Sequence, residues 1–346
     1  MPAKFILSKK KLSEQLKILE DLNLKVSYSY KTNREVGNIL QEISKVDFSI
    51  HEKEELDMIK DKSRIWFFVQ AESEEELEKL LKKGVKKFVI DNEVDLQRIL
   101  NLIKKTKTKI DLSLRMKFQE HRINSGKYFV YGMESKIINK IIEEESQNEF
   151  IKNLGIHIHR KSQNTSEWEI KQEIEDSLTE ENLKRINFLN LGGGLPTEYK
   201  SYTSKIMPYI FQKIKIAKEF LQKYNIQTYI EPGRFLAGPS IKLQTQIIQI
   251  YNKNLILNTT IYNCALDTIL TGTKMLVEQE LNDSQEGEYY LIKGNSPTRD
   301  DIFRYKVKLK NPKVGDKITF INAGAYNYTT DFFGYKKICT ETVKDF

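Results

Sequence analysis

The sequence predicts an α/β protein with a parallel sheet followed by a region of mainly antiparallel strands. Two observations predict this class. Over the first two-thirds of the 346-residue chain, short apolar runs alternate with longer amphipathic stretches, and after about Gly238 strand-like runs dominate. Repeated βα units specify a parallel sheet that is either doubly wound or closed into a barrel. A chain of this length can bury a large core or form two domains.

The expected strands of the first part are short and rich in β-branched and aromatic residues. They are Lys25–Tyr30, Ile65–Val69, Phe88–Asp91, Ile110–Met116, Leu154–His159, Phe188–Leu191 and Thr228–Glu231. Helices are expected between them, including Glu74–Lys83, Val94–Lys104, Ser135–Glu145 and Tyr209–Tyr224. In the last of these, apolar residues recur at helical spacing, which keeps one face buried.

The second part is expected to contain the strands Ile241–Tyr251, Leu255–Tyr262, Tyr289–Lys293 and Lys317–Ile321. Pro312 and Gly315-Asp316 supply turns between the later ones. These runs predict a second, antiparallel β domain.

The composition argues against several classes of protein. The net charge is +8, but basic clusters such as Lys82–Lys87 alternate with acidic stretches such as Glu72–Glu78. Nucleic-acid proteins more often concentrate their charge in one stripe, so we expect no nucleic-acid partner. No apolar run is long enough to span a membrane, and the N-terminus lacks a signal-peptide core, so we expect a cytoplasmic protein.

Cysteine and histidine usage argues against structural metals and disulfides. The two cysteines, Cys264 and Cys339, form no CxxC pair, and the four histidines form no HExxH motif. We therefore expect no metal site.

Reactive or polar groups recur at the ends of the expected strands. If the sheet is a barrel, its active residues lie at those carboxyl ends. The residues at these positions are Lys31, Arg115, His157, His159, Gly192–Gly194 and Glu231.

This set matches the physical needs of a site for pyridoxal 5'-phosphate (PLP). A lysine amine can form an imine with the aldehyde, and Lys31 follows the first strand. A glycine-rich loop lets backbone N–H groups approach a phosphate. An imidazole can cover one face of the ring, and a carboxylate such as Glu231 can keep the ring nitrogen protonated. The chain has no GxGxxG or GxxxxGK[ST] motif, which makes nucleotide binding the poorer interpretation of the glycines.

The motifs resemble, in order, those of the fold-type III PLP enzymes, the ornithine/diaminopimelate/arginine decarboxylase group with an alanine racemase-like barrel. The matching stretches are VSYSYKTN, GIHIHRKSQ, LNLGGGLP, EPGR and NAGAY. The resemblance implies that Lys31 is the Schiff-base residue and that His159 stacks on the cofactor ring. It also implies that Glu231 is the partner of the ring nitrogen. The further cofactor contacts that it implies are Arg115, Ser162, Gly192, Gly193, Gly194, Gly233, Arg234 and Tyr326.

The resemblance also implies an architecture. A (β/α)8 TIM-type barrel is expected over residues 1–240 and a C-terminal β domain over residues 241–346. A homodimer with shared active sites is expected. Because the chain begins close to the first barrel element, an N-terminal strand of the β domain is expected to be absent.

The chain departs from the resemblance in the second domain. The decarboxylases use a GPxCxSxD motif whose cysteine returns a proton, and the matching GNSPTRDD stretch has Pro297 at that position. Arg299 and Asp301 in this stretch and Asn263 are the expected substrate contacts. In the barrel, Ser49 replaces an acidic residue usually found beneath the lysine.

These features together predict a PLP-dependent α-decarboxylase of an unusual or conjugated amino acid. It would be distinct from plain ornithine or diaminopimelate decarboxylases and would act in polyamine or specialised-metabolite biosynthesis. Arg299 suggests a substrate with an acidic or polar far end, and Lys31, His159 or water could return the proton. Two alternatives remain. One is a racemase or epimerase that uses Tyr326 or Tyr328 as a second acid/base, and the other is a non-catalytic regulator.

Overall fold

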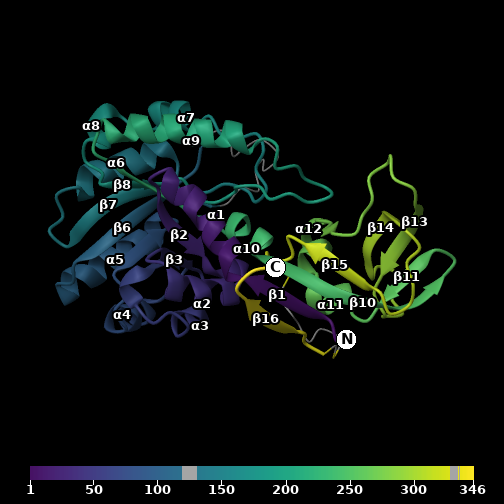
Figure 1. Ribbon diagram of the computed structural model, residues 1–346. Coiled ribbons are helices and arrows are strands. Elements are labelled where there is room, and N and C mark those ends of the chain that lie inside the picture. Colours follow the sequence, from purple (N-terminus) through teal and green to yellow (C-terminus); the bar gives the residue numbers. More distant parts are fainter. Residues whose placement is uncertain (119–130, 328–333, 335) are drawn as a thin grey trace.

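The computed structural model describes residues 1–118, 131–327, 334 and 336–346. Figure 1 shows a helix-wrapped barrel beside a second, strand-rich part, with β1, α10 and β10 running between them. Within the described residues, no helix combines the length and the apolar character that crossing a bilayer requires.

Eight parallel strands close into a barrel, which confirms the predicted (β/α)8 architecture. Each strand pairs with its neighbour in chain order, and β2 pairs with β9 to complete the ring. The strands are β2 (Lys25–Ser29), β3 (Asp47–Ile50), β4 (Ile65–Val69), β5 (Lys87–Ile90), β6 (Ile110–Met116), β7 (Ile151–Ile158), β8 (Phe188–Asn190) and β9 (Gln227–Ile230).

Helices surround the barrel, and their starts follow from local capping. Asn33 accepts hydrogen bonds from the first turn of α2, and Ser73 with Glu76 forms a capping box at α4. The helices are α2 (Arg34–Ile43), α3 (Lys53–Leu56), α4 (Glu74–Lys82), α5 (Glu93–Thr106), α6 (Ser135–Glu145), α7 (Ile170–Ser177), α8 (Glu180–Leu183) and α9 (Met207–Gln222). Short 3₁₀ turns occur at Tyr30–Thr32 and Lys62–Arg64. The apolar face predicted for α9 is buried.

The second part is a mixed sheet in the order β12-β15-β10-β11-β13-β14, to which β1 and β16 are attached. Most of its pairs are antiparallel, while β1 with β16 and β11 with β13 are parallel. Its strands are β1 (Lys4–Ser8), β10 (Ile241–Tyr251), β11 (Asn254–Leu257), β12 (Leu276–Val277), β13 (Glu288–Lys293), β14 (Ile302–Leu309), β15 (Lys317–Ile321) and β16 (Cys339–Val343). Its helices are α11 (Ile261–Cys264) and α12 (Leu266–Thr271).

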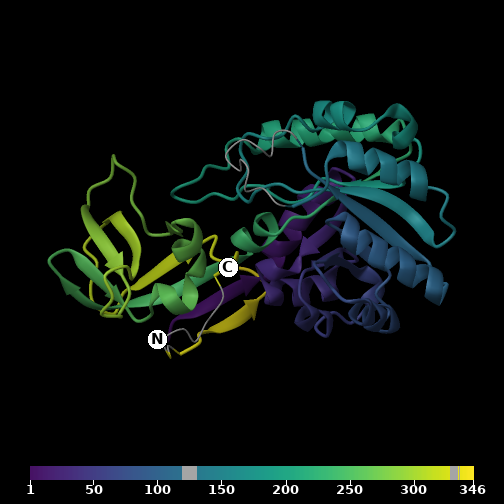
Figure 2. The same ribbon diagram turned by 180° about the vertical axis from the view of Figure 1, so that it is seen from behind.

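The N-terminal strand corrects one expectation. The sheet of the second part was expected to lack such a strand, but β1 pairs with β10 and with β16 at the far end of the chain. Figures 1 and 2 both show β1 and β16 side by side. From β1 the chain enters the barrel through α1 (Lys9–Asp21), and it returns through α10 (Arg234–Ser240).

One hydrophobic cluster extends from the barrel into the second sheet, from Leu114 of β6 to Ile241 and Phe320. The predicted division at residue 240 falls between α10 and β10. That these parts act as separate domains stays a prediction.

The sequence analysis missed one barrel strand and extended another expected strand too far. Strand β3 was not foreseen because its four residues, DFSI, are too few to establish a period. The expected strand Leu255–Tyr262 ends at Leu257, because Thr260 caps a new helix at Ile261.

Candidate active site

A cavity of about 520 Å³ opens at the carboxyl ends of the barrel strands. It brings together most of the strand-end residues singled out in the sequence. Among the predicted cofactor contacts, it is lined by Lys31, Arg115, His159, Ser162, Gly193, Gly194, Glu231, Gly233, Arg234 and Tyr326. Tyr326 comes from the second part of the chain, so both parts build the cavity.

Lys31 sits in the 3₁₀ turn that directly follows β2. Its amine faces the cavity together with Glu231 and Arg115. Burial lowers the pKa of Lys31, the Glu231 carboxylate opposes this, and the Arg115 guanidinium lowers the pKa further. A lowered pKa leaves more of the amine neutral and therefore nucleophilic.

Glu231 follows β9 and is held by two donors. Ser49 Oγ donates to Oε1, and His157 Nε2 lies 2.7 Å from Oε2. Burial acts to raise the pKa of Glu231, but the charge of His157 and the hydrogen bonds from His157 and Ser49 lower it to about 2. The site therefore contains a carboxylate that stays ionised at neutral pH.

Two further imidazoles line the cavity. His159 follows β7, and His51 follows β3 with its ring stacked on Phe68 at 4.5 Å between centroids. Burial and the positive charge of Lys31 lower the pKa of His51 to about 3. Burial and Arg115 also lower the pKa of His159 well below its usual value. Both rings are consequently neutral at physiological pH.

The glycine turn Gly192–Gly194 leaves no room for side chains. Gly192 and Gly194 have φ of +70° and +96°, and a Cβ on Gly192 would lie 1.9 Å from the carbonyl oxygen of Ile158. A Cβ on Gly193 would lie 2.9 Å from the carbonyl oxygen of Glu231. Gly193 and Gly194 line the cavity, while Gly192 forms the turn behind them.

Arg234 links the barrel to the second part. It donates to both carboxylate oxygens of Asp267 at 2.6 and 3.0 Å, and its Nε donates to Ser162 Oγ at 3.2 Å. Its guanidinium lies 5.0 Å from the ring centroid of Tyr326. Burial acts to lower the pKa of Arg234, but Asp267 and Tyr199 raise it. A permanent cation therefore lies beside Ser162.

Tyr326 is fixed through its backbone. It has φ of +58°, and its N–H donates to the carbonyl of Thr32, next to Lys31, at 3.0 Å. Thr32 Oγ1 also lies 3.4 Å from the Tyr326 hydroxyl. The expected second acid/base candidate, Tyr328, falls outside the described residues.

Arg115 lies one residue before the end of β6 and donates to Asp91 at 3.0 Å. Its guanidinium lies 5.0 Å from the ring of Tyr131, and its buried Nε has no hydrogen-bond partner among the described residues. Arg115 thus brings a donor to the cavity wall that could bind a ligand.

The predicted substrate contacts lie elsewhere in the chain. The Asp301 carboxylate is buried and accepts hydrogen bonds from the backbone of Ile261 and Ser296. Asn263 donates to the carbonyl of Lys336. Arg299 is exposed on its loop, as is Pro297. Among the described residues, none of these four lines the cavity of its own chain.

Neither Cys264 nor Cys339 lines the barrel cavity of its own chain. The Cys264 thiol is buried in α11 and donates to the carbonyl of Thr260, and burial raises its pKa to about 12. Cys339 is exposed in β16.

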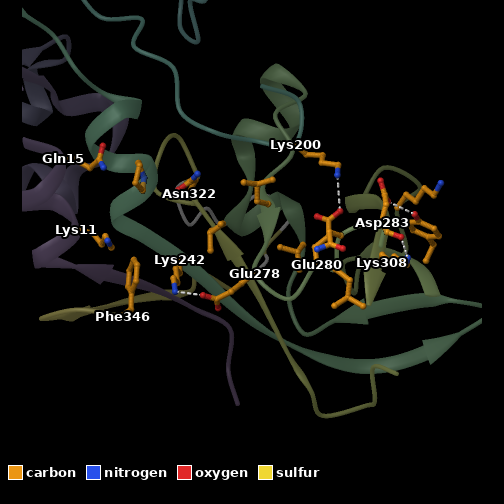
Figure 3. Close-up of a pocket in the computed structure, with 18 residues that line it drawn as sticks. Lys11, Gln15, Lys200, Lys242, Glu278, Glu280, Asp283, Lys308, Asn322 and Phe346 are labelled. Atoms are coloured by element: carbon orange, nitrogen blue, oxygen red, sulfur yellow. Dashed lines mark hydrogen bonds and ion pairs between the residues drawn. The ribbon is translucent and has the colours of Figure 1, made fainter. Parts of the chain in front are cut away.

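A larger cavity of about 950 Å³ lies between α1 and the second sheet (Figure 3). Two ion pairs lie within its lining, Lys200 with Glu280 and Lys242 with Glu278. Lys31, His51, His159 and the glycine turn do not line this larger cavity. We therefore take the barrel cavity as the candidate active site.

Several residues of the site were missed or given no role by the sequence. His51, Asp91 and Asp267 were not named, and Ser49 was noted for what it replaces rather than for what it contacts. His51 directly follows the β3 strand that was not foreseen, so recognition of that strand would have placed it at the barrel mouth. Asp267 carried no local signal, because its partner Arg234 lies 33 residues away in sequence.

Residues 7–238 match the family described as pyridoxal-dependent decarboxylases, pyridoxal binding domain. Diaminopimelate decarboxylase of Bacillus subtilis is 24% identical over 307 residues, 77% of this chain and 66% of that protein. A carboxynorspermidine/carboxyspermidine decarboxylase of Campylobacter jejuni is 27% identical over 152 residues, 40% of this chain and 38% of that protein. The matched regions thus span between about two-fifths and two-thirds of these relatives.

The fold is shared with solved structures. A mutant diaminopimelate decarboxylase from Helicobacter pylori, complexed with L-lysine, superposes with a TM-score of 0.83 at 17% identity, over 100% of this chain and 92% of that one. Because the family match covers most of the chain, the protein belongs to the pyridoxal-dependent decarboxylase family, and residues 7–238 carry its pyridoxal-binding domain.

Proposed function

We propose that the protein is a PLP-dependent α-decarboxylase of an unusual or conjugated amino acid. The observation that carries this proposal is the convergence of Lys31, His159, Glu231 and the glycine turn in one cavity. When bound, PLP supplies an electron sink that stabilises the charge left on Cα as a carboxylate departs as CO2.

The residues present fit PLP. The Gly192–Gly194 turn forms a cradle that any Cβ would fill, and Arg234 provides a permanent cation beside Ser162. Such a combination of backbone N–H groups and a cation suits a phosphate. We assign the phosphate to this turn together with Ser162, Gly233, Arg234 and Tyr326.

We assign the remaining groups by their chemistry. The amine of Lys31 would hold the cofactor aldehyde, and its lowered pKa favours a reactive, neutral amine. His159 would cover one ring face and Glu231 would pair with the ring nitrogen, while Arg115 lies at the cavity wall. Proton return to the product falls to Lys31, His159 or water, since Pro297 has no transferable proton.

Substrate choice rests on the second part of the chain and on a partner subunit. We propose a homodimer in which Arg299 of the partner subunit, exposed and outside the cavity of its own chain, reaches the active site. An arginine there favours a substrate whose far end is acidic or polar. The carboxynorspermidine/carboxyspermidine relative supports a conjugated amino acid in polyamine metabolism. A cytoplasmic location stays a prediction.

CO2 release tests the proposed function. The purified holoenzyme would be incubated with carboxyl-labelled ornithine, lysine, arginine, diaminopimelate, carboxyspermidine and carboxynorspermidine. We expect CO2 from carboxyspermidine or carboxynorspermidine in preference to ornithine and diaminopimelate, and none from the Lys31→Ala variant. PLP binding without CO2 from any compound would contradict the proposal. Deuterium uptake at Cα without CO2 would indicate a racemase, and neither reaction would indicate a non-catalytic protein.

A further inference from the structure

Both oxygens of the Glu231 carboxylate make hydrogen bonds with residues of other strands. Ser49 of β3 donates to Oε1, and the Ser49 hydroxyl is in turn 2.8 Å from Ser27 Oγ of β2. His157 of β7 contacts Oε2 at 2.7 Å. The side chains of Ser27, Ser49 and His157 are buried. The carboxylate is thus oriented by side chains from across the barrel.

The contact with Glu231 accounts for the polar function of His157. An ionised carboxylate can only accept, so Nε2 carries the proton of this hydrogen bond. The other ring nitrogen, Nδ1, is buried and has no hydrogen-bond partner among the described residues. The ring packs edge-on against Phe68 at 5.1 Å, which fixes its plane.

We propose that His157, together with Ser49, is a positioning residue that holds Glu231 ionised and aimed into the cavity toward the ring nitrogen of PLP. This inference rests on the proposed function and deepens it. His157 acts through Glu231 and does not itself touch the cofactor. Ser49 stands where the decarboxylases that the chain resembles usually have an acidic residue. Ser49 carries no charge, but it donates a hydrogen bond to Glu231.

The physical reason is the cost of burying a carboxylate. Burial alone would raise the pKa of Glu231, and the charge of His157 together with the hydrogen bonds from His157 and Ser49 reverses that shift. Without a donor, Glu231 would take up a proton more readily. A protonated Glu231 would offer the ring nitrogen a donor where it needs an acceptor, and the electron sink would weaken.

Two variants of His157 separate positioning from packing. His157→Phe keeps a ring of similar size and removes the donor, while His157→Gln keeps an N–H that can reach the carboxylate. We expect His157→Phe to weaken PLP binding to the apoprotein roughly 10- to 100-fold, as for loss of a hydrogen bond to a charged group. We also expect an altered absorbance spectrum of the bound cofactor and a lower kcat with little change in KM. His157→Gln should restore most of each property.

Ser49→Ala provides an independent test that does not depend on the folding of the His157 variants. It should weaken PLP binding and alter the spectrum in the same direction. Ser113→Ala is its matched control, because it removes a buried strand hydroxyl that has no hydrogen-bond partner among the described residues. Ser113→Ala should leave PLP affinity, spectrum and kcat unchanged.

The outcomes distinguish this inference from the proposed function. If the unmodified protein binds no PLP, the proposed function fails. If it binds PLP while His157→Phe and Ser49→Ala keep its affinity, spectrum and kcat, the role of His157 is overturned and the proposed function stands. If His157→Phe does not fold, the other two variants decide. A normal spectrum and affinity in Ser49→Ala, together with a large loss of PLP affinity in His157→Gln, would likewise overturn the role of His157.

Discussion

Arg234 of the barrel and Asp267 of the second part form a buried, two-point ion pair, with contacts of 2.6 and 3.0 Å. Asp267 is itself oriented, since its backbone N–H donates to Asn327 and Thr271 Oγ1 donates to its carboxylate. The pair therefore connects the Ser162 side of the cavity to α12. Arg234 is thus held by a residue of the strand-rich part.

Removing Asp267 should destabilise the protein and weaken cofactor binding together. Asp267→Ala leaves a buried guanidinium without its carboxylate, which costs about 3 to 5 kcal/mol. Denaturant unfolding and PLP titration of the apoprotein measure the two effects. Glu278→Ala, which breaks an exposed pair with Lys242, is the control and should cost no more than about 1 kcal/mol. Equal losses in the two variants would contradict a special role for Asp267.

The glycine turn should reject even one methyl group. Gly194→Ala places a Cβ 2.9 Å from the carbonyl oxygen of Lys161 at φ of +96°, so the turn must shift. We expect at least a roughly tenfold loss of PLP affinity, equivalent to about 1.4 kcal/mol. Gly315→Ala has the same kind of backbone strain, φ of +95°, but nothing within 4 Å of the new Cβ. It should lose stability but keep PLP affinity.

Glu231 should contribute to acid sensitivity. In the unfolded chain this carboxyl titrates near 4.5, whereas in the folded protein its pKa is about 2. Between these values the unfolded state binds more protons, so stability falls as pH falls from about 4.5 to about 2. Unfolding free energies measured across this range should drop less steeply in Glu231→Gln. An unchanged slope would show that Glu231 is not ionised in the folded state as described.

The lowered pKa of Lys31 should appear in the pH dependence of PLP attachment. Burial is the main cause, and Arg115 adds to it while Glu231 opposes it. The midpoint for covalent attachment should lie below 10.5, the usual value for lysine. Arg115→Gln removes a nearby cation and should move the midpoint to higher pH, whereas Glu231→Gln should move it to lower pH. Shifts in the same direction would contradict this assignment of charges.

Sequence reasoning brought together the residues of the candidate site because barrel chemistry follows a positional rule. Lys31, Arg115, His159 and Glu231 were each placed at a strand end by local pattern, and the carboxyl ends of parallel strands meet at one face. Closure of the barrel then brought them into one cavity. The order of the motifs supplied the family, which the match over residues 7–238 confirms.

What the sequence could not provide was contact across the barrel and between its parts. His157 was seen as a strand-end residue, but its pairing with Glu231 depends on the register of β7, β8 and β9. The partnership of Ser49 with Glu231 likewise requires barrel closure. The pairing of β1 with β16 joins the two ends of the chain, and no local period encodes such a contact.

The most direct test of the site is borohydride reduction of the protein with PLP bound, followed by peptide mass spectrometry. Reduction fixes the cofactor to the amine that holds it. We predict a single modified peptide carrying a phosphopyridoxyl group on Lys31, and none in Lys31→Ala. Modification of a different lysine, or labelling that persists in Lys31→Ala at the same level, would contradict the assignment of this cavity as the PLP site.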